Sequence, residues 1–280
     1  MADTLAQLLV HVDSSARSSE RLALACQLAA RHGAALTGLY AAAPSFTELT
    51  LGAAPSPEYV ASLVAIDDAK RARARAVFDS ACAGHPVRSA WSELTEPPAI
   101  GGFVQQSLYA DLLVFGQHDA ADPAAADVPP DFVESVLGVC GKPALVIPYA
   151  GAVRPVGGTV MVAWKETRES ARALAAALPL LRLASQVHVV TFGEKEEPFV
   201  SGAGLSLETY LKLHGVRASL HHGGPEPQQV GELLLSRAFD FDADLLVMGC
   251  YGHSRAREWV LGGASRSVLR SMTLPVLMAH

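Results

Sequence analysis

Short apolar runs alternate with longer amphipathic stretches along most of the 280-residue chain. Runs such as 8–12, 111–115 and 160–164 contain few polar residues, which is typical of strands that are covered on both faces. Stretches such as 20–31 and 169–183 repeat their apolar residues with the period of a helix. This alternation predicts an α/β fold in which helices cover both faces of a parallel sheet.

The order of these elements occurs twice, which predicts two tandem domains of the same fold. The first strand of the first half, 8–12, corresponds to 160–164 in the second half. The run Asp-Leu-Leu-Val-Phe-Gly at 111–116 corresponds to Asp-Leu-Leu-Val-Met-Gly at 244–249. We expect domains at 1–150 and 156–280, joined by a stretch in which proline and glycine interrupt regular structure.

Composition narrows the possible partners. The net charge is −6, so no basic surface favours nucleic-acid binding. Four cysteines without a CxxC pair are typical of reduced thiols. The chain also lacks an apolar run of roughly 20 residues and a basic segment at its start. These features predict a soluble, cytoplasmic protein without nucleic-acid or membrane partners.

The most informative stretch lies between 244 and 265. A buried strand leads to Gly249-x2-Gly252-x9-Gly262, and the next residues begin a helix. Glycines let a ligand approach bare backbone amides, and a helix N-terminus adds unpaired N–H groups that suit phosphate. This pattern predicts a nucleotide-binding site.

These residues resemble the universal stress protein family in its tandem form. The resemblance is carried by the glycine spacing after an Asp-Leu-Leu-Val strand, by the helix at 266–270 and by the proline-led last strand at 273–277. It implies that each domain is a doubly wound, five-stranded parallel sheet of order 3-2-1-4-5, similar to adenine-nucleotide α-hydrolases. A nucleotide would lie across the ends of the first and fourth strands, near an acid at the end of the first.

Neither half matches the family completely. The N-terminal half keeps the acid, Asp13, but its loop after Gly116 lacks the second glycine and carries Asp119 and Asp122, which repel phosphate. We therefore expect a degenerate site there. The C-terminal half keeps the glycines but has Lys165 in place of the acid, and a lysine cannot accept a hydrogen bond from ribose. Gly263 stands where the family has Ser or Thr, and Ser265 could cap the helix and partly substitute.

By the resemblance, the C-terminal site consists of three strand ends, the glycine loop and the first turn of the last helix. The loop and helix would contact phosphate, and the strand ends would enclose the base. The predicted contacts are Ala163, Trp164, Lys165, Val190, Thr191, Met248, Gly249, Gly252, His253, Gly262, Gly263, Ala264 and Ser265.

Two functions fit this pattern. In the first, the chain is a stress-response protein whose C-terminal domain binds ATP or another adenine nucleotide, with or without Mg²⁺, as a signal for a protein partner. Hydrolysis would be slow at most, because no general base or metal carboxylate is evident. In the second, the chain is a ligand-free scaffold that acts through protein–protein contacts, which Lys165 favours.

Other candidate groups have simpler interpretations. His221 and His222 are adjacent on a strand and point to opposite faces, so we predict no metal site. Arginines at 71, 73 and 75 share a helix with aspartates and favour a solvated face over a phosphate clamp. The last strands, 144–147 and 276–279, should lie at bare sheet edges and pair with each other. One chain would then be a pseudo-symmetric dimer, and a further homodimer of chains is left open.

Overall fold

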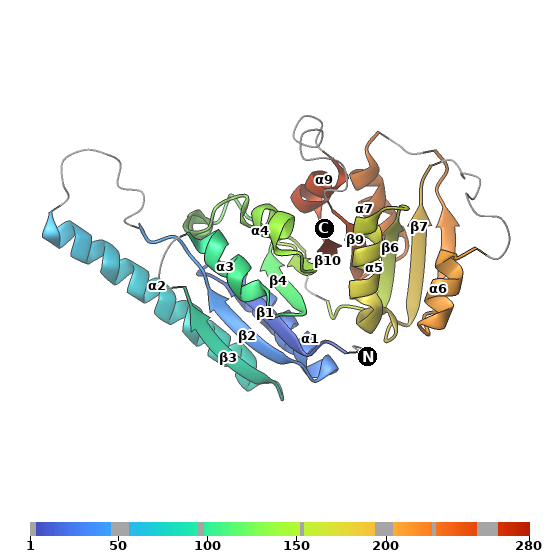
Figure 1. Ribbon diagram of the computed structural model, residues 1–280. Coiled ribbons are helices and arrows are strands. Elements are labelled where there is room, and N and C mark those ends of the chain that lie inside the picture. The colour runs from blue at the N-terminus through green and yellow to red at the C-terminus, as the bar shows by residue number, and fades with distance from the viewer. Residues whose placement is uncertain are drawn as a thin grey trace. The chain divides into compact units, whose positions relative to one another are not determined.

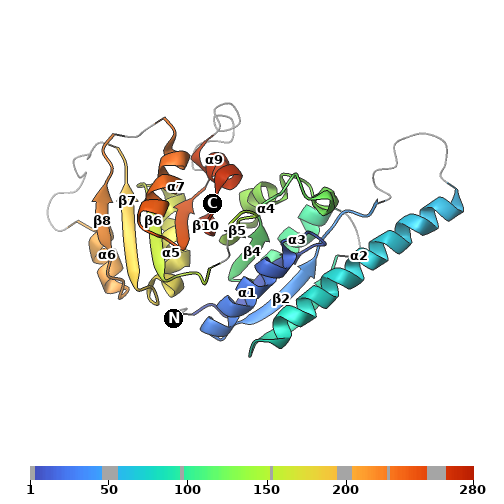
Figure 2. The same cartoon turned by 180° about the vertical axis from the view of Figure 1, so that it is seen from behind.

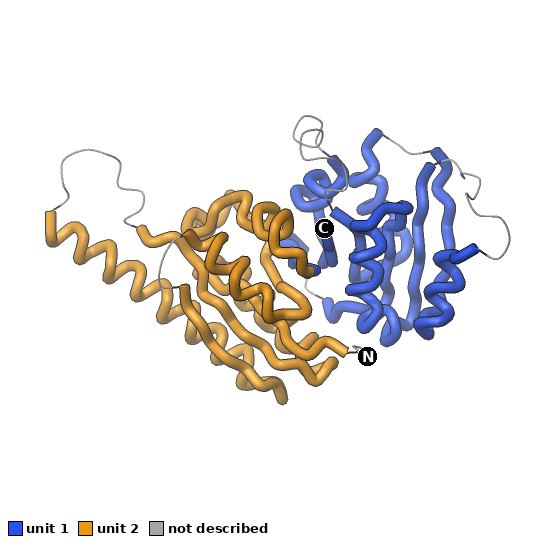
Figure 3. The backbone as a smooth tube through the Cα atoms, viewed as in Figure 1, with its two compact units in different colours: residues 1–3, 143–280 blue, residues 4–142 orange. Residues whose placement is uncertain are grey.

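The computed structural model describes residues 4–45, 56–94, 98–151, 154–193, 204–225, 228–250 and 263–280. The chain divides into two compact units (Figure 3). The N-terminal unit comprises residues 4–142, and the C-terminal unit comprises residues 1–3 and 143–280. The predicted domain limits, 1–150 and 156–280, stay a prediction.

The N-terminal unit contains a parallel sheet of strand order β3-β2-β1-β4. Figures 1 and 2 show α1 and α2 on one face of this sheet and α3 and α4 on the other. The elements are β1 (Gln7–Val12), α1 (Ser18–His32), β2 (Ala35–Tyr40), α2 (Pro57–Ala83), β3 (Arg88–Glu93), α3 (Ala99–Ser107), β4 (Leu112–Gly116), the 3₁₀ helix η2 (Pro123–Asp127) and α4 (Phe132–Cys140).

The C-terminal unit contains a sheet of order β5-β10-β9-β6-β7-β8 (Figure 1). All neighbouring strands are parallel except β5 and β10. The elements are β5 (Ala144–Ile147), β6 (Thr159–Trp164), α5 (Arg168–Leu181), β7 (Gln186–Thr191), α6 (Leu207–Leu213), β8 (Ser219–His222), α7 (Val230–Asp240), β9 (Leu245–Gly249), α9 (Ala264–Ser271) and β10 (Val276–Ala279).

This topology confirms the predicted fold class. If the strands after β5 are numbered in chain order from β6 to β10, their order across the sheet is third, second, first, fourth, fifth, as the resemblance implied. The last strands of the two halves also pair, with Leu277 opposite Leu145 in an antiparallel register. Each therefore covers the edge that the other would leave open.

The long helix α2 corrects one expectation. From the sequence, Pro44, Pro55 and Pro57 favour a long loop over residues 43–62 and a helix over 63–83, but α2 already begins at Pro57. Ser56 accepts a hydrogen bond from the Tyr59 N–H at 3.2 Å, and Pro57 occupies the first turn. Serine before proline is a favourable start for a helix because the proline lacks only an N–H that would be unpaired there. Within the described residues, no helix is long and apolar enough to cross a membrane.

Candidate functional site

The candidate site in the C-terminal unit lies where the strand order reverses. β6 pairs with β7 on one side and with β9 on the other, so the connections from β6 and β9 diverge at their carboxyl ends. Such a switch point is the usual ligand site of an open α/β sheet. Ala163 is the register partner of both Met248 and Val190, and Trp164 is that of Thr191. The strand-end residues that the sequence predicted are thus neighbours.

Gly249, at the end of β9, lies against the start of α5. A Cβ atom at this position would be 2.6 Å from the Ser170 nitrogen and 2.7 Å from the Glu169 carbonyl carbon. Both atoms belong to the backbone, so they cannot move aside like the tip of a flexible side chain. Thr167 caps α5 by accepting a hydrogen bond from the Ser170 N–H at 3.2 Å. Helix packing alone therefore requires glycine at 249. Lys165 is exposed at this end of β6.

The last helix, α9, provides the second part of the site. Its N-cap residue is Gly263, and Ala264 and Ser265 form its first turn. The expected capping role of Ser265 is wrong, because the helix begins one residue before it. Gly231 of α7 packs closely on this turn, since a Cβ there would be 2.9 Å from the Ala264 carbonyl oxygen. Gly252, His253 and Gly262 lie outside the described residues.

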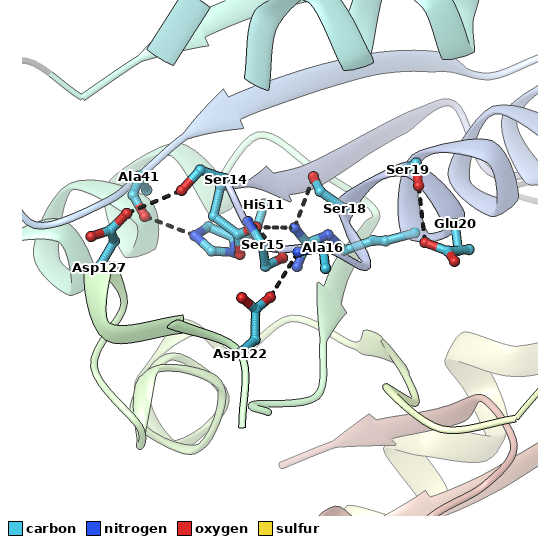
Figure 4. A network of polar contacts seen from close by, with 12 residues as sticks. His11, Ser14, Ser15, Ala16, Ser18, Ser19, Glu20, Ala41, Asp122 and Asp127 are labelled. Carbon is cyan, nitrogen blue, oxygen red and sulfur yellow. Dashed lines mark hydrogen bonds and ion pairs between the residues drawn. The ribbon is translucent and has the colours of Figure 1, made fainter. Parts of the chain in front are cut away.

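The N-terminal unit has a charged network at the corresponding position, and Figure 4 shows its surroundings. Asp13 follows β1 and is 6% exposed. Its Oδ1 accepts a hydrogen bond from the Arg21 guanidinium at 2.7 Å and another from the Ser15 N–H at 3.0 Å. The Ser15 hydroxyl also donates to this oxygen. Arg21 is itself 4% exposed and donates to the Ser18 hydroxyl at 3.2 Å.

Arg21 fills the space beside the end of β4. A Cβ atom on Gly116 would lie 2.5 Å from Nη1 of Arg21. The guanidinium therefore lies at the switch point between β1 and β4, where the resemblance placed a nucleotide. Asp13, the acid carried over from the family, is engaged in an internal ion pair. This arrangement supplies a physical reason for a degenerate site at Asp13 and Gly116.

Two further carboxylates hold the turn after β1. Asp122 accepts a hydrogen bond from the Ala16 N–H at 2.7 Å, and Asp127 accepts one from the Ser14 hydroxyl at 3.0 Å (Figure 4). Lys70 of α2 pairs with Asp127 at 2.6 Å. These carboxylates make the region near the turn unfavourable for another anion.

Burial decides the protonation of His11 beside this network. Its Nε2–H donates to the Ala41 carbonyl at 2.8 Å, and Nδ1 lies 3.5 Å from Asp13. Burial lowers the pKa of His11 from 6.5 to about 4, and the positive charge of Arg21 acts in the same direction. Burial raises the pKa of Asp13, but the positive charge of Arg21 and the hydrogen bonds from Arg21 and Ser15 outweigh this effect and keep the pKa below its usual value. The network holds neutral His11 beside ionised Asp13 and Arg21.

Sequence reasoning missed Arg21, although a signal was present. Arg21 lies on the apolar face of α1 together with Ala25 and Leu28, which are also buried. A charged residue on such a face needs a buried partner. In the C-terminal half, the residue at the same distance from the first strand is Ala173, which is 1% exposed. The two halves therefore differ in the side chain that α1 and α5 direct toward the sheet at this position.

The adjacent histidines of β8, His221 and His222, contact different residues. His221 contacts His188, with 3.1 Å between His188 Nδ1 and His221 Nε2, whereas His222 lies 3.3 Å from the Thr191 hydroxyl. Their partners differ because neighbouring strand residues point to opposite faces. Within the described residues, no three His, Cys, Asp or Glu side chains form a group that could hold a metal ion.

Comparison with known families supports this description. Residues 158–280 match the sequence profile of the universal stress protein family. The chain carries a universal stress protein domain. The family recognised from the glycine spacing and the closing helix and strand is thereby confirmed for this part of the chain. No similar sequence was found among proteins with curated descriptions.

Solved structures extend the likeness beyond the universal stress protein domain. A universal stress protein from Archaeoglobus fulgidus DSM 4304 matches with a TM-score of 0.70 and 15% identity, over 98% of this chain and 95% of that one. A protein of unknown function from Pseudomonas aeruginosa PAO1 matches with a TM-score of 0.58 and 16% identity, over 99% of this chain and 93% of that one. At these identities the likeness concerns the fold, which both halves of the chain share with these structures.

Proposed function

We propose that the C-terminal unit binds an adenine nucleotide, ATP in particular, and that the protein acts in a stress response through this bound state. The observation that carries the proposal is that the β6–β9 switch point lies within residues 158–280, which match the sequence profile of the universal stress protein family. The switch point is the preferred ligand position of this fold class. The glycine spacing Gly249-x2-Gly252-x9-Gly262 is the sequence feature that favours a nucleotide.

The expected pose follows from the parts of the site. The adenine base would lie between the ends of β6 and β7, against Trp164 and Thr191. The phosphates would approach the first turn of α9, where Gly263 and Ala264 begin the helix. The first N–H groups of a helix have no partners within it, and the helix dipole adds a partial positive charge. The glycine loop would complete the phosphate contacts, and Mg²⁺ would accompany ATP only as a counterion.

The contrast between the halves supports one nucleotide per chain. In the N-terminal unit, Arg21 is adjacent to Gly116 and pairs with Asp13. In the C-terminal unit, the residue at the position of Arg21 is Ala173, whose methyl group brings no charge to the switch point. We therefore expect the N-terminal unit to bind no nucleotide.

Hydrolysis is expected to be slow or absent. Phosphoryl transfer requires a residue that orients the attacking water and carboxylates that hold Mg²⁺. At the end of β6 stands Lys165, which supplies neither. A bound nucleotide would then serve as a regulatory ligand that a protein partner recognises.

The alternative function is a ligand-free scaffold. Lys165 favours this alternative because it replaces the acid that contacts ribose in the family.

The deciding experiment is calorimetric titration of ATP, with and without Mg²⁺, into the full chain and two variants of Gly263. The backbone of Gly263 has φ −53°, which any side chain can adopt. Serine and aspartate are both good N-cap residues, so neither Gly263→Ser nor Gly263→Asp should disturb α9. Gly263→Asp places a negative charge at the expected phosphate position, whereas Gly263→Ser supplies the hydroxyl that the family has there.

We expect one ATP per chain for the wild type, equal or tighter binding for Gly263→Ser and at least tenfold weaker binding for Gly263→Asp. Equal affinity in the two variants would contradict the phosphate pose. If no heat and no shift of the melting temperature appear in any of the three proteins, the nucleotide proposal is wrong and the scaffold is supported.

A further inference from the structure

Two buried cysteines of the N-terminal unit lie in contact. Cys26 belongs to α1 and Cys82 to the last turn of α2, and their Sγ atoms are 3.5 Å apart. Figure 2 shows the two helices side by side on the same face of the sheet. The cysteines are separated by 56 positions along the chain. The fold therefore creates this pair, and no local sequence motif does.

A small movement would bring the two sulfur atoms from 3.5 Å to bonding distance. A disulfide requires about 2.05 Å between its sulfur atoms, so the two Sγ atoms need to approach by roughly 1.5 Å. Cys82 stands next to the last residue of α2, and only Ala74, Phe78 and Cys82 of this helix are buried. Helix ends open locally more easily than helix centres, so this end can supply the small shift.

We propose that Cys26 and Cys82 form an oxidation site, at which a hydroperoxide converts the two thiols into an intramolecular disulfide joining α1 to α2. This site is independent of the nucleotide proposal, because it lies in the other unit and uses none of the predicted nucleotide contacts. Cys140 differs from this pair in its neighbour, because its sulfur accepts a hydrogen bond from the Lys142 N–H at 3.4 Å.

The chemistry balances with hydrogen peroxide as the oxidant. The Cys82 sulfur attacks one peroxide oxygen and the O–O bond breaks, which gives a sulfenic acid and one water molecule. The Cys26 sulfur then attacks the sulfenic sulfur and the S–O bond breaks, which gives the disulfide and a second water molecule. Two thiols are oxidised, one peroxide is reduced, and the thiol protons leave in the two waters.

Exposure assigns the order of attack and the expected rate. Cys82 is 8% exposed and Cys26 is fully buried, so peroxide reaches Cys82 first. Burial and the neighbouring Cys82 thiol raise the pKa of Cys26 to about 12. Since the thiolate is the reactive form, the second step should be slow at neutral pH. The site should therefore respond to prolonged oxidation and not to a brief pulse of peroxide.

The test uses the reduced full chain, incubated with excess hydrogen peroxide and then quenched. We expect the number of titratable thiols to fall from the four of the sequence to two, and the mass to fall by two hydrogens. Peptide mapping should find Cys26 linked to Cys82. The closed loop should raise the melting temperature of the unit by roughly 5–10 °C, and dithiothreitol should reverse the shift.

Variants separate this pair from general thiol oxidation. Cys82→Ala and Cys26→Ala should each abolish the intramolecular disulfide, whereas Cys140→Ala should retain it. Circular dichroism checks that each variant folds, and Cys82→Ala at the helix end serves if Cys26→Ala is unstable. Four thiols remaining after an exposure that oxidises the urea-unfolded chain would overturn the proposal. A link through Cys140 or Cys250, or a disulfide between chains, would also overturn it.

Discussion

Replacement of Arg21 by methionine tests whether the charged network at the end of β1 stabilises the N-terminal unit. Methionine retains much of the length of the arginine side chain but removes the guanidinium that pairs with Asp13 at 2.7 Å. Asp13 would then be a buried carboxylate at 6% exposure, with hydrogen bonds from Ser15 and no cationic partner in the pair. The variant therefore measures the cost of leaving this charge without its partner.

Removing one partner from a buried ion pair costs about 3–5 kcal/mol. The N-terminal unit is of a size for which each kcal/mol changes the melting temperature by roughly 3 °C, so we expect a decrease of about 10–15 °C. The double variant Asp13→Asn with Arg21→Met removes both charges and should recover most of the loss. Arg17→Met is the matched control, because Arg17 pairs with Glu20 at an exposed position. It should cost less than about 1 kcal/mol.

Urea unfolding followed by the fluorescence of Trp91 isolates the N-terminal unit. Trp91 lies on β3 of that unit, with its ring centroid 5.5 Å from that of Phe78, so its emission reports on the local packing. Changing Trp164 and Trp259 to phenylalanine in every protein of the series removes the other tryptophan signals. If Arg21→Met loses less than about 1 kcal/mol, or if the double variant is no more stable than the single one, the ion-pair reasoning is refuted.

Three further predictions concern pH and both units. Folded His11 binds its proton only near pH 4, whereas the unfolded chain binds it near 6.5, so His11 contributes stability above pH 6.5 that is lost as the pH falls toward 4. This loss amounts to about 3 kcal/mol, and the pH profile of His11→Gln, measured by urea unfolding, should be flatter by that amount; parallel profiles would contradict the assignment. Gly249→Ala should destabilise the C-terminal unit by about 1–3 kcal/mol, because the added Cβ would clash with the backbone of α5. A Cβ at Gly204 would have no atom within 4 Å, so Gly204→Ala is the control in the same thermal-melting series. Equal melting temperatures for the two variants would show that α5 can move to accommodate the methyl group at 249. Lys165→Asp supplies a carboxylate that can accept hydrogen bonds from ribose, so ATP should bind about tenfold tighter in calorimetry, and unchanged affinity would mean that ribose lies elsewhere.

The sequence predicted those features that depend on local pattern. Apolar runs bounded by glycine and proline marked the strands, and the limits expected for the last strands agree with β5 and β10. Their pairing could also be anticipated, because an unpaired strand at a sheet edge tends to pair with another strand. The start of α2 was missed because the Ser56–Pro57 signal stands among other prolines, where it resembles a loop.

The parts of the site that could not be predicted depend on contacts between distant residues. Arg21 and Gly116 are far apart in sequence, and nothing local indicates that the guanidinium lies beside that glycine. The contact of Cys26 with Cys82 likewise arises from the packing of α1 on α2. Gly249 was predicted as a ligand contact, but the close approach of α5 also requires glycine at this position. A glycine motif alone does not distinguish these two causes.

The antiparallel pair of β5 and β10 has a kinetic consequence. Val146 and Val276, which are partners in the register, are 130 residues apart. Closing a loop of this length costs chain entropy before the contacts between β5 and β10 can stabilise the pair. This step should therefore occur late in refolding. Until then, the backbone of β5 is an unpaired edge that can accept β10 of another copy. Refolding at high protein concentration should therefore yield exchanged dimers, in which each chain completes the sheet of its neighbour.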